Sequence, residues 1–229
     1  MRRLRPVARH WLAILNLLWA MYVGLPWLAP VLMQVGAPAP ARVIYGLYST
    51  QCHQMAQRSY FLFGQQATYG LDELRALGFE GTHAGSLGAI LGNEQMGWKV
   101  AWSDRMVAMY TATLVFGLLY GVVRSSRRRP LRSISPWLFL LLLIPMALDG
   151  GTHVVSDLQG IGAGFRATNQ WLATLTRTRL RTSFYAGTAW GSFNASMRLM
   201  TGALFGLGSV SFLYPQIDTI VAHHFDRAE

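Results

Sequence analysis

Residues 11–33, "WLAILNLLWAMYVGLPWLAPVLM", form a run of 23 residues without a charged side chain. An α-helix needs about 20 mostly apolar residues to cross the hydrocarbon core of a bilayer. Trp11 and Trp27 lie at positions that suit the two membrane interfaces, where indole rings are favoured. The run therefore predicts a transmembrane helix and places the chain among membrane proteins.

A cleaved signal peptide is the alternative interpretation of this run, because arginines precede it and the small-residue stretch "GAPAPAR" follows it. The apolar region of a signal peptide is usually only about 7 to 15 residues long. Pro40 would also disfavour cleavage after Ala39. Both points favour a permanent helix.

Three further apolar stretches predict spans at about 105–123, 137–155 and 197–214. We expect an all-α membrane protein, a four-transmembrane-helix bundle that forms one integral membrane domain over residues 1–229. Glycines four residues apart in the second and fourth spans would let helices approach closely. These glycines are Gly117 and Gly121, and Gly202 and Gly206.

The formal net charge of +10 comes from 20 basic and 10 acidic residues, a balance that in a soluble protein would suggest nucleic-acid binding. Many of the cations instead flank apolar runs, the pattern of cytoplasmic ends of membrane helices. They are Arg2, Arg3, Arg5, Arg9, Arg124, Arg127, Arg128, Arg129 and Arg132. We therefore expect a multi-pass protein of the bacterial cytoplasmic (inner) membrane, with both termini and the loop 124–136 cytoplasmic. Its partner is then membrane lipid and not nucleic acid.

This topology places two long segments, 34–104 and 156–196, on the non-cytoplasmic side. Both are too polar and glycine-rich to span the membrane. The stretch "HAGSLGAILG" (83–92) is apolar but too short to cross the bilayer, which favours a re-entrant or interfacial piece. We expect short interfacial or re-entrant helices in these outer segments.

Asp149 lies near the outer end of the third span, where a carboxylate is costly unless it is paired or hydrated. His153 follows four residues later and would share its helical face. Together with His53, these residues could bind a divalent metal. A proton relay and a structural ion pair are the alternatives. The possible partners of Asp149 in such a pair are Arg105, Arg166 and Arg198.

Asp104 and Arg105 begin the second span, and Arg198 begins the fourth. One interpretation is charge pairing at helix ends, with Asp104 favoured by the positive end of its helix dipole. The other is a polar cluster beneath the outer segments that holds the helices together or binds an anion. Both interpretations place the three residues near the outer interface.

The stretch "QCHQMAQRSY" (51–60) contains the single cysteine, Cys52, directly beside His53. Adjacent side chains diverge in helices and strands, so this pair lacks the geometry of a nucleophile and its base. A lone cysteine forms no disulfide within the chain. We expect no catalytic residue here and interpret the stretch as an interfacial anchor, with Arg58 available to a carboxylate.

Four strings together resemble a bacterial family of uncharacterised integral membrane proteins, classed as a domain of unknown function. The most specific are Cys-His-Gln-x-x-x-Arg-Ser-aromatic at 52–60 and Pro-x-x-x-Asp-Gly at 145–150. The others are "MGWKVAWSDRMVAMY" (96–110) and "GSFNASMRLMTGALFGLG" (191–208). The residues that match family motif positions by this resemblance are Cys52, His53, Arg58, Asp149 and Arg198.

Many members of that family carry a Cys-x-x-Cys motif soon after the first string, where this chain has "QQATYGLDEL". A metal or redox role shared by several cysteines therefore does not carry over to this chain. The resemblance implies no particular activity.

The sequence is most consistent with a non-catalytic accessory or scaffold subunit of a larger membrane assembly. Its partners would be other membrane-complex subunits or further copies of the chain. The alternative is a ligand-binding membrane protein, such as a metal-dependent enzyme or a carrier. Its site would lie on the outer side and be formed by His53, Asp149 and His153.

Overall fold

Four long apolar helices dominate the computed structural model, which describes residues 10–81, 83–127 and 131–226. They are α2 (Trp11–Gln34), α6 (Asp104–Ser125), α7 (Pro136–Asp157) and α11 (Phe193–Asp226). All four are long and apolar enough to cross a membrane, which confirms the predicted spans. α11 extends well past the predicted 197–214 at both ends.

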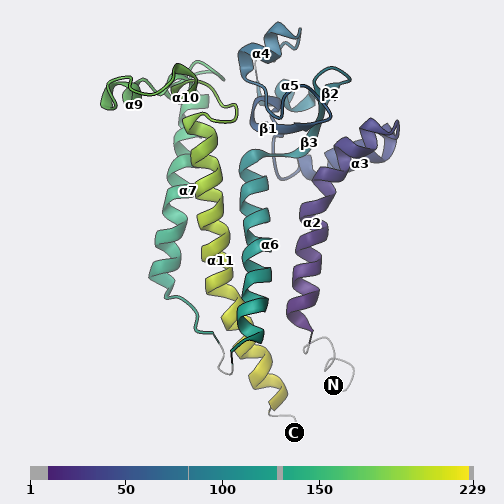
Figure 1. Cartoon of the computed structure of the whole chain (residues 1–229), viewed down its shortest axis with the longest axis vertical. Helices are drawn as coiled ribbons and strands as arrows, with labels where there is room; N and C mark the ends of the chain where they lie inside the picture. The colour runs from purple at the N-terminus through teal and green to yellow at the C-terminus, as the bar shows by residue number, and fades with distance from the viewer. Residues whose placement is uncertain (1–9, 82, 128–130, 227–229) are drawn as a thin grey trace.

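The long helices stand side by side in the order α7, α11, α6, α2 (Figure 1). α11 packs against both α7 and α6, and α6 packs against α2. The arginines expected to flank the spans lie partly outside the described residues, namely Arg2, Arg3, Arg5, Arg9, Arg128 and Arg129.

Glycines allow the close approach of α11 to α6. A Cβ added to Gly206 would lie 2.6 Å from the Ala112 Cβ and 2.7 Å from the Thr113 backbone nitrogen. A Cβ on Gly202 would lie 2.7 Å from the Ala108 Cβ. The small-residue face predicted for the fourth span is therefore the surface that contacts α6.

Residues 38–81 and 83–103 form a compact unit, here called the cap, at one end of the long helices (Figure 1). We call this end of the helices the outer end. The helical elements of the cap are α3 (Pro38–Ser49), the 3-10 turn η2 (Ala56–Arg58), α4 (Leu71–Ala76) and α5 (Ala84–Ala89). The strands are β1 (Ser59–Leu62), β2 (Gly92–Asn93) and β3 (Gly97–Ser103).

The strands form an antiparallel sheet in the order β1-β3-β2, with Phe61 opposite Lys99 and Gly92 opposite Trp98. This sheet was not predicted from the sequence, which suggested only short helices in the outer segments. The apolar stretch 83–92 belongs to the cap as well. Its Leu87 is buried with Phe61 and Leu74 in the interior of the cap.

Lys99 of β3 is fully buried, and its ammonium group links two distant parts of the cap. The Nζ donates to the Gln54 carbonyl at 2.6 Å and to the Gly88 carbonyl at 2.7 Å. Burial lowers the pKa of Lys99 from 10.5 to about 7. The bond to Gln54 fixes the stretch 51–58, which carries several candidate site residues, against the sheet, and the bond to Gly88 fixes α5 there.

The second outer segment, 158–192, connects α7 to α11 and contains α8 (Phe165–Thr168), α9 (Gln170–Leu175) and α10 (Thr182–Tyr185). A Cβ on Gly164 would collide with the Ser156 backbone carbonyl, so glycine permits this close turn. The Asn194 side-chain amide donates to the Arg166 carbonyl at 2.7 Å and to the Gly187 carbonyl at 2.7 Å. The Asn194 bonds tie Arg166 to the start of α11, and the Arg166 backbone N–H donates to the Ser156 hydroxyl at 3.0 Å, which holds it beside the outer end of α7.

Candidate functional site

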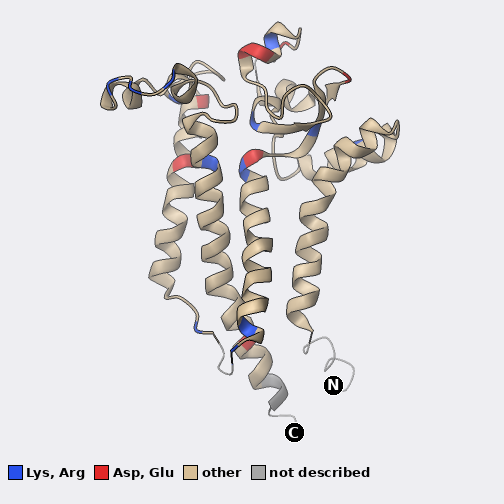
Figure 2. Cartoon of the chain, in the orientation of Figure 1, with Lys and Arg blue, Asp and Glu red and all other residues tan. Residues whose placement is uncertain are grey.

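Charged residues gather at the outer ends of α6, α7 and α11, whereas the middles of the long helices carry none (Figure 2). Asp149, His153 and Asp157 follow one another at intervals of four residues on α7, so they share a face of that helix. α6 contributes Asp104 and Arg105 at its first turn. The remaining charged groups come from η2, α8 and α11.

Asp149 is paired with two arginines. Arg105 Nη2 lies 2.7 Å from Asp149 Oδ2, and Arg166 Nη2 lies 2.5 Å from Asp149 Oδ1. The Asp149 side chain is only 1% exposed. A Cβ on Gly150 would lie 2.5 Å from Arg105 Nη1, so glycine at this position leaves room for the guanidinium. Arg105 and Arg166, two of the three arginines expected to pair with Asp149, therefore do so in the structure.

The third expected partner, Arg198, pairs with Asp104 instead. Its Nε lies 2.8 Å from Oδ1 and 2.7 Å from Oδ2 of Asp104, and both residues are buried. Its Nη2 also donates to the Thr188 carbonyl at 2.9 Å. This pair joins the start of α6 to the start of α11, as the interpretation of helix-end charge pairing expects.

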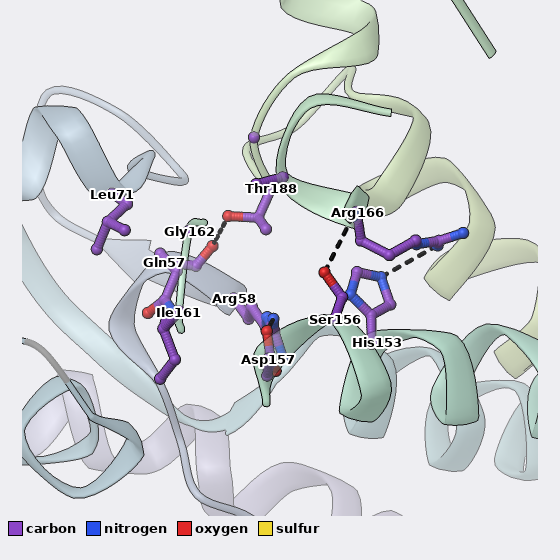
Figure 3. Close-up of a pocket in the computed structure, with 12 residues that line it drawn as sticks. Gln57, Arg58, Leu71, His153, Ser156, Asp157, Ile161, Gly162, Arg166 and Thr188 are labelled. Atoms are coloured by element: carbon purple, nitrogen blue, oxygen red, sulfur yellow. Dashed lines mark hydrogen bonds and ion pairs between the residues drawn. The ribbon is translucent and has the colours of Figure 1, made fainter. Parts of the chain in front are cut away.

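Arg58 connects the cap to α7. Its Nη2 lies 2.8 Å from Asp157 Oδ1, and the pair is largely buried. The neighbouring Gln57 carbonyl accepts a hydrogen bond of 2.6 Å from the Thr188 hydroxyl (Figure 3). The carboxylate expected for Arg58 is therefore Asp157, a residue that the sequence had not singled out.

His153 is a neutral imidazole in this arrangement. Its Nε2 lies 3.1 Å from Arg166 Nη2 (Figure 3). A guanidinium group has donors and no acceptor, so Nε2 must accept and the ring proton must be on Nδ1. Burial lowers the pKa of Arg166, and the Asp149 carboxylate opposes this shift. Arg166 thus donates hydrogen bonds to both Asp149 and His153.

A cavity of about 290 Å³ lies among these residues, between the stretch 51–58 and the outer ends of the long helices. Of the eight residues proposed as a site from the sequence, all but Asp149 line this cavity, here called the first cavity. They are Cys52, His53, Arg58, Asp104, Arg105, His153 and Arg198. His53 and His153 therefore face the same space although they come from the cap and from α7. Asp149 lies behind the cavity and holds Arg105.

The groups around the first cavity carry an excess of positive charge and of hydrogen-bond donors. Four guanidinium groups (Arg58, Arg105, Arg166, Arg198) meet three carboxylates (Asp104, Asp149, Asp157), so the cluster carries one net positive charge. Among the described residues, three that line the cavity each have a buried nitrogen without a partner. These nitrogens are Arg58 Nε, His153 Nδ1 and Arg198 Nη1. With His153 in the tautomer assigned above, all three are hydrogen-bond donors.

The geometry does not fit a divalent metal. Within the described part of the chain, no group of three or more His, Cys, Asp or Glu residues has the arrangement of a metal site. Both carboxylate oxygens of Asp149 bind guanidinium groups, and the accepting nitrogen of His153 faces Arg166. A cation near the expected ligands Asp149 and His153 would meet positive charge. The site therefore suits an anion better than a metal.

Cys52 is partly buried, and its thiol contacts backbone and hydroxyl groups. Sγ donates to the Ser103 hydroxyl at 3.3 Å, and the Gln54 backbone N–H lies 3.4 Å from Sγ. These contacts place Cys52 at the wall of the first cavity, where it joins the end of β3 to the stretch 51–58.

Asp157 and Arg166 complete the cluster but were not among the residues proposed as a site. A signal for Asp157 was present, because it lies one turn beyond His153 on the face that carries Asp149. Arg166 was considered only as an ion-pair partner. Its contact with His153 depends on the fold of the 158–192 segment, which has no recognisable motif.

A family profile described as predicted membrane protein (DUF2085) matches residues 95–212, which run from the turn before β3 into α11. An uncharacterized protein of the archaeon Methanocaldococcus jannaschii is 27% identical over 112 residues, which are 49% of this chain and 49% of the relative. The match thus spans about half the length of that relative. No solved structure matches the chain.

The profile match includes Asp104, Arg105, Asp149, His153 and Arg198, but the Cys-His-Gln string at 52–60 lies outside it. The resemblance noted from the sequence is therefore supported for its three later strings. Since the profile covers 118 of the 229 residues, the chain belongs to the family of predicted membrane proteins DUF2085.

Proposed function

We propose that this protein is a membrane protein that binds an anionic ligand in the first cavity. One observation carries the proposal: three residues that line the cavity, Arg58, His153 and Arg198, each have a buried donor without a partner, and the surroundings carry net positive charge. Buried donors without acceptors are costly, and an anion would supply acceptors and neutralise the excess charge. A phosphate or a carboxylate has the chemistry that arginines recognise.

The ligand-binding role that we propose differs from the metal-dependent version suggested by the sequence. His53 and His153 remain at the site, but as neighbours of an anion. The proposal assigns binding, and it assigns no chemical step to any residue.

The test is binding of inorganic phosphate, sulfate and acetate to the protein purified in an uncharged detergent, at constant ionic strength with chloride as reference. We expect at least one of these anions to raise the midpoint of thermal unfolding. Arg58→Gln should weaken that binding by roughly 10- to 100-fold, since a charge-assisted hydrogen bond contributes about 1.5–3 kcal/mol. Arg58→Lys should retain part of the affinity.

Arg75→Gln is the matched control, because Arg75 also pairs with an aspartate but lies on the exposed surface of α4. It should bind the anion as the unaltered protein does. If none of the three anions binds, or if Arg58→Gln and Arg75→Gln bind equally well, the proposal is wrong.

A role as an accessory or scaffold subunit is a second candidate. The exposure of α7 favours this role. Only 11% of the apolar window of α7 is buried inside the protein, against 39% for α11. Such a helix could contact another subunit or a second copy as well as lipid. Native mass measurement after mild purification tests this role, and a lone monomer would count against it.

We further propose that the membrane is the bacterial cytoplasmic membrane, with both termini cytoplasmic and the cap on the other side. The flanking arginine clusters support this orientation through the positive-inside rule. A reporter that is active only in the cytoplasm, fused to the C-terminus, should be active. An inactive reporter on a stably inserted protein would show that the C-terminus is not cytoplasmic and would contradict the proposed topology.

A further inference from the structure

A second cavity, of about 470 Å³, lies next to the first. The two cavities share part of their linings, including His53, Arg58 and Asp157. The Arg58–Asp157 ion pair therefore lies at the boundary between them. A ligand that contacts Arg58 in the first cavity is therefore directly beside the second.

The linings of the two cavities differ in chemistry. Both linings include apolar side chains, but three arginines and two aspartates line the first, whereas, of the described residues, Arg58 and Asp157 are the only arginine and aspartate that line the second. Its apolar lining residues are Met55, Ala84, Val154, Leu158 and Ile161. A space whose charged residues are concentrated at one end, with exposed apolar side chains at the other, matches a molecule with a charged head and a hydrocarbon chain.

The apolar end opens toward the part of α7 that faces away from the protein. Gly150, Val154 and Leu158 are spaced four residues apart and form one stripe along the helix. Gly150 and Val154 line the first cavity, and Val154 and Leu158 line the second. Val154 is 62% exposed and Leu158 is 82% exposed, so the stripe connects the cavities with the outer surface of α7.

The position along the chain places this opening at the edge of the membrane. α7 is a candidate span that ends at Asp157, so Val154 lies in its last turn and Leu158 directly follows it. At this depth the polar headgroups of a bilayer meet the hydrocarbon core. A lipid could therefore place its headgroup at Arg58 while its chain remains beside α7.

We propose that the ligand of the first cavity is an anionic membrane lipid. Its phosphate or carboxylate binds at Arg58, His153 and Arg198. Its hydrocarbon chain passes through the second cavity along Val154 and Leu158. This inference rests on the proposed function, because it needs the arginine cluster to bind an anion.

The test compares three probes at equal total concentrations and at one fixed concentration of an uncharged detergent. Lysophosphatidic acid carries both a phosphate and one acyl chain, glycerol 3-phosphate carries the phosphate alone, and monoacylglycerol carries the chain alone. We expect lysophosphatidic acid to bind at least tenfold more tightly than either of the others. Burial of about two methylene groups is enough for a tenfold gain in affinity.

The variant Leu158→Ser should weaken the binding of lysophosphatidic acid about tenfold and leave the binding of glycerol 3-phosphate unchanged, because Leu158 lines the second cavity and not the first. Its side chain is exposed, so the variant is expected to fold. Leu175→Ser is the control, since Leu175 is equally exposed (74%) but lies on α9, outside the lining of either cavity.

Equal affinities for lysophosphatidic acid and glycerol 3-phosphate, or no effect of Leu158→Ser, would overturn the lipid inference and leave anion binding in place. Equal binding of monoacylglycerol would overturn it too, because the charge would then not be recognised. Failure of both phosphate probes, together with the simple anions above, would contradict the proposed function itself.

Discussion

Asp149 and His153, one turn apart on α7, share a single guanidinium nitrogen. Arg166 Nη2 lies 2.5 Å from Asp149 Oδ1 and 3.1 Å from His153 Nε2. The carboxylate and the imidazole are therefore both acceptors for a positive group. This arrangement explains why two residues that resemble metal ligands in the sequence form part of a cluster with a net positive charge.

Asp149→Asn should destabilise the protein strongly. The substitution removes the charge that Arg105 and Arg166 share, and breaking a buried ion pair typically costs about 3–5 kcal/mol. The midpoint of thermal unfolding in detergent measures the effect. Asp72→Asn is the control, because Asp72 pairs with Arg75 on the surface and its side chain is 97% exposed. It should change the midpoint little, and equal effects of the two variants would contradict the prediction.

Asp157→Asn should strengthen anion binding. The change leaves Arg58 without its carboxylate partner and raises the net charge around the first cavity by one. We expect the affinity for the anion identified above to rise on the order of tenfold at low salt, with a smaller gain at high salt. Calorimetric titration at two ionic strengths measures both effects. A weaker affinity would mean that Asp157 positions Arg58 for the ligand rather than competing with it.

Gly206→Ala should separate α11 from α6. The added methyl group would lie 2.6 Å from the Ala112 Cβ, and overpacking of this kind costs about 1–3 kcal/mol. A lower midpoint of thermal unfolding is the expected result. Gly151→Ala is a matched control in α7, because a Cβ there would meet nothing within 4 Å. Alanine is the better helix former, so this control should leave the stability unchanged or raise it slightly.

Stability should depend on pH through Lys99. Its pKa is about 7 in the folded cap and 10.5 when exposed, so between these values the unfolded chain binds more protons. Stability should therefore rise as the pH increases from 7 to 10.5, by at most about 1.4 kcal/mol per pH unit, and the penalty is complete below pH 7.

Hydrogen exchange in the cap between pH 7 and 9, corrected for the intrinsic exchange rate, measures this dependence. Lys99→Met should remove the additional slope. It should also destabilise the cap at high pH, because two buried carbonyls lose their donor. The same pH slope in both proteins would show that Lys99 does not change its protonation on unfolding.

The membrane helices could be predicted from the sequence because crossing a bilayer requires a long apolar run, which is a local property. The ends of α11 could not be predicted as well. Asn194 and Asp218 make the ends of this helix polar, yet both are buried and paired through contacts with other parts of the chain. A search of the sequence for apolar runs therefore finds the middle of α11 and misses its ends.

The sheet of the cap was missed because β3 leads without a break into the second span and contains a lysine. The buried Lys99 is tolerated because its ammonium group donates to two backbone carbonyls. These carbonyls lie 45 and 11 residues away in the chain, so no local pattern reveals them. The candidate site was predicted in part, since the charged residues near the span ends were visible. The cavities and their unpaired donors depend on the contact between Arg58 and Asp157, 99 residues apart, which no local pattern reveals.

β3 ends at Ser103 and α6 begins at Asp104, so the sheet and the membrane helix are joined without a linker. A hinge needs residues that can change their backbone angles, and none separates these two elements. The cap and α6 should therefore move as one rigid body. Any relative motion around the first cavity must then come from α7 or from the 158–192 segment, and a displacement of α7 from the cap would have to break the Arg58–Asp157 pair.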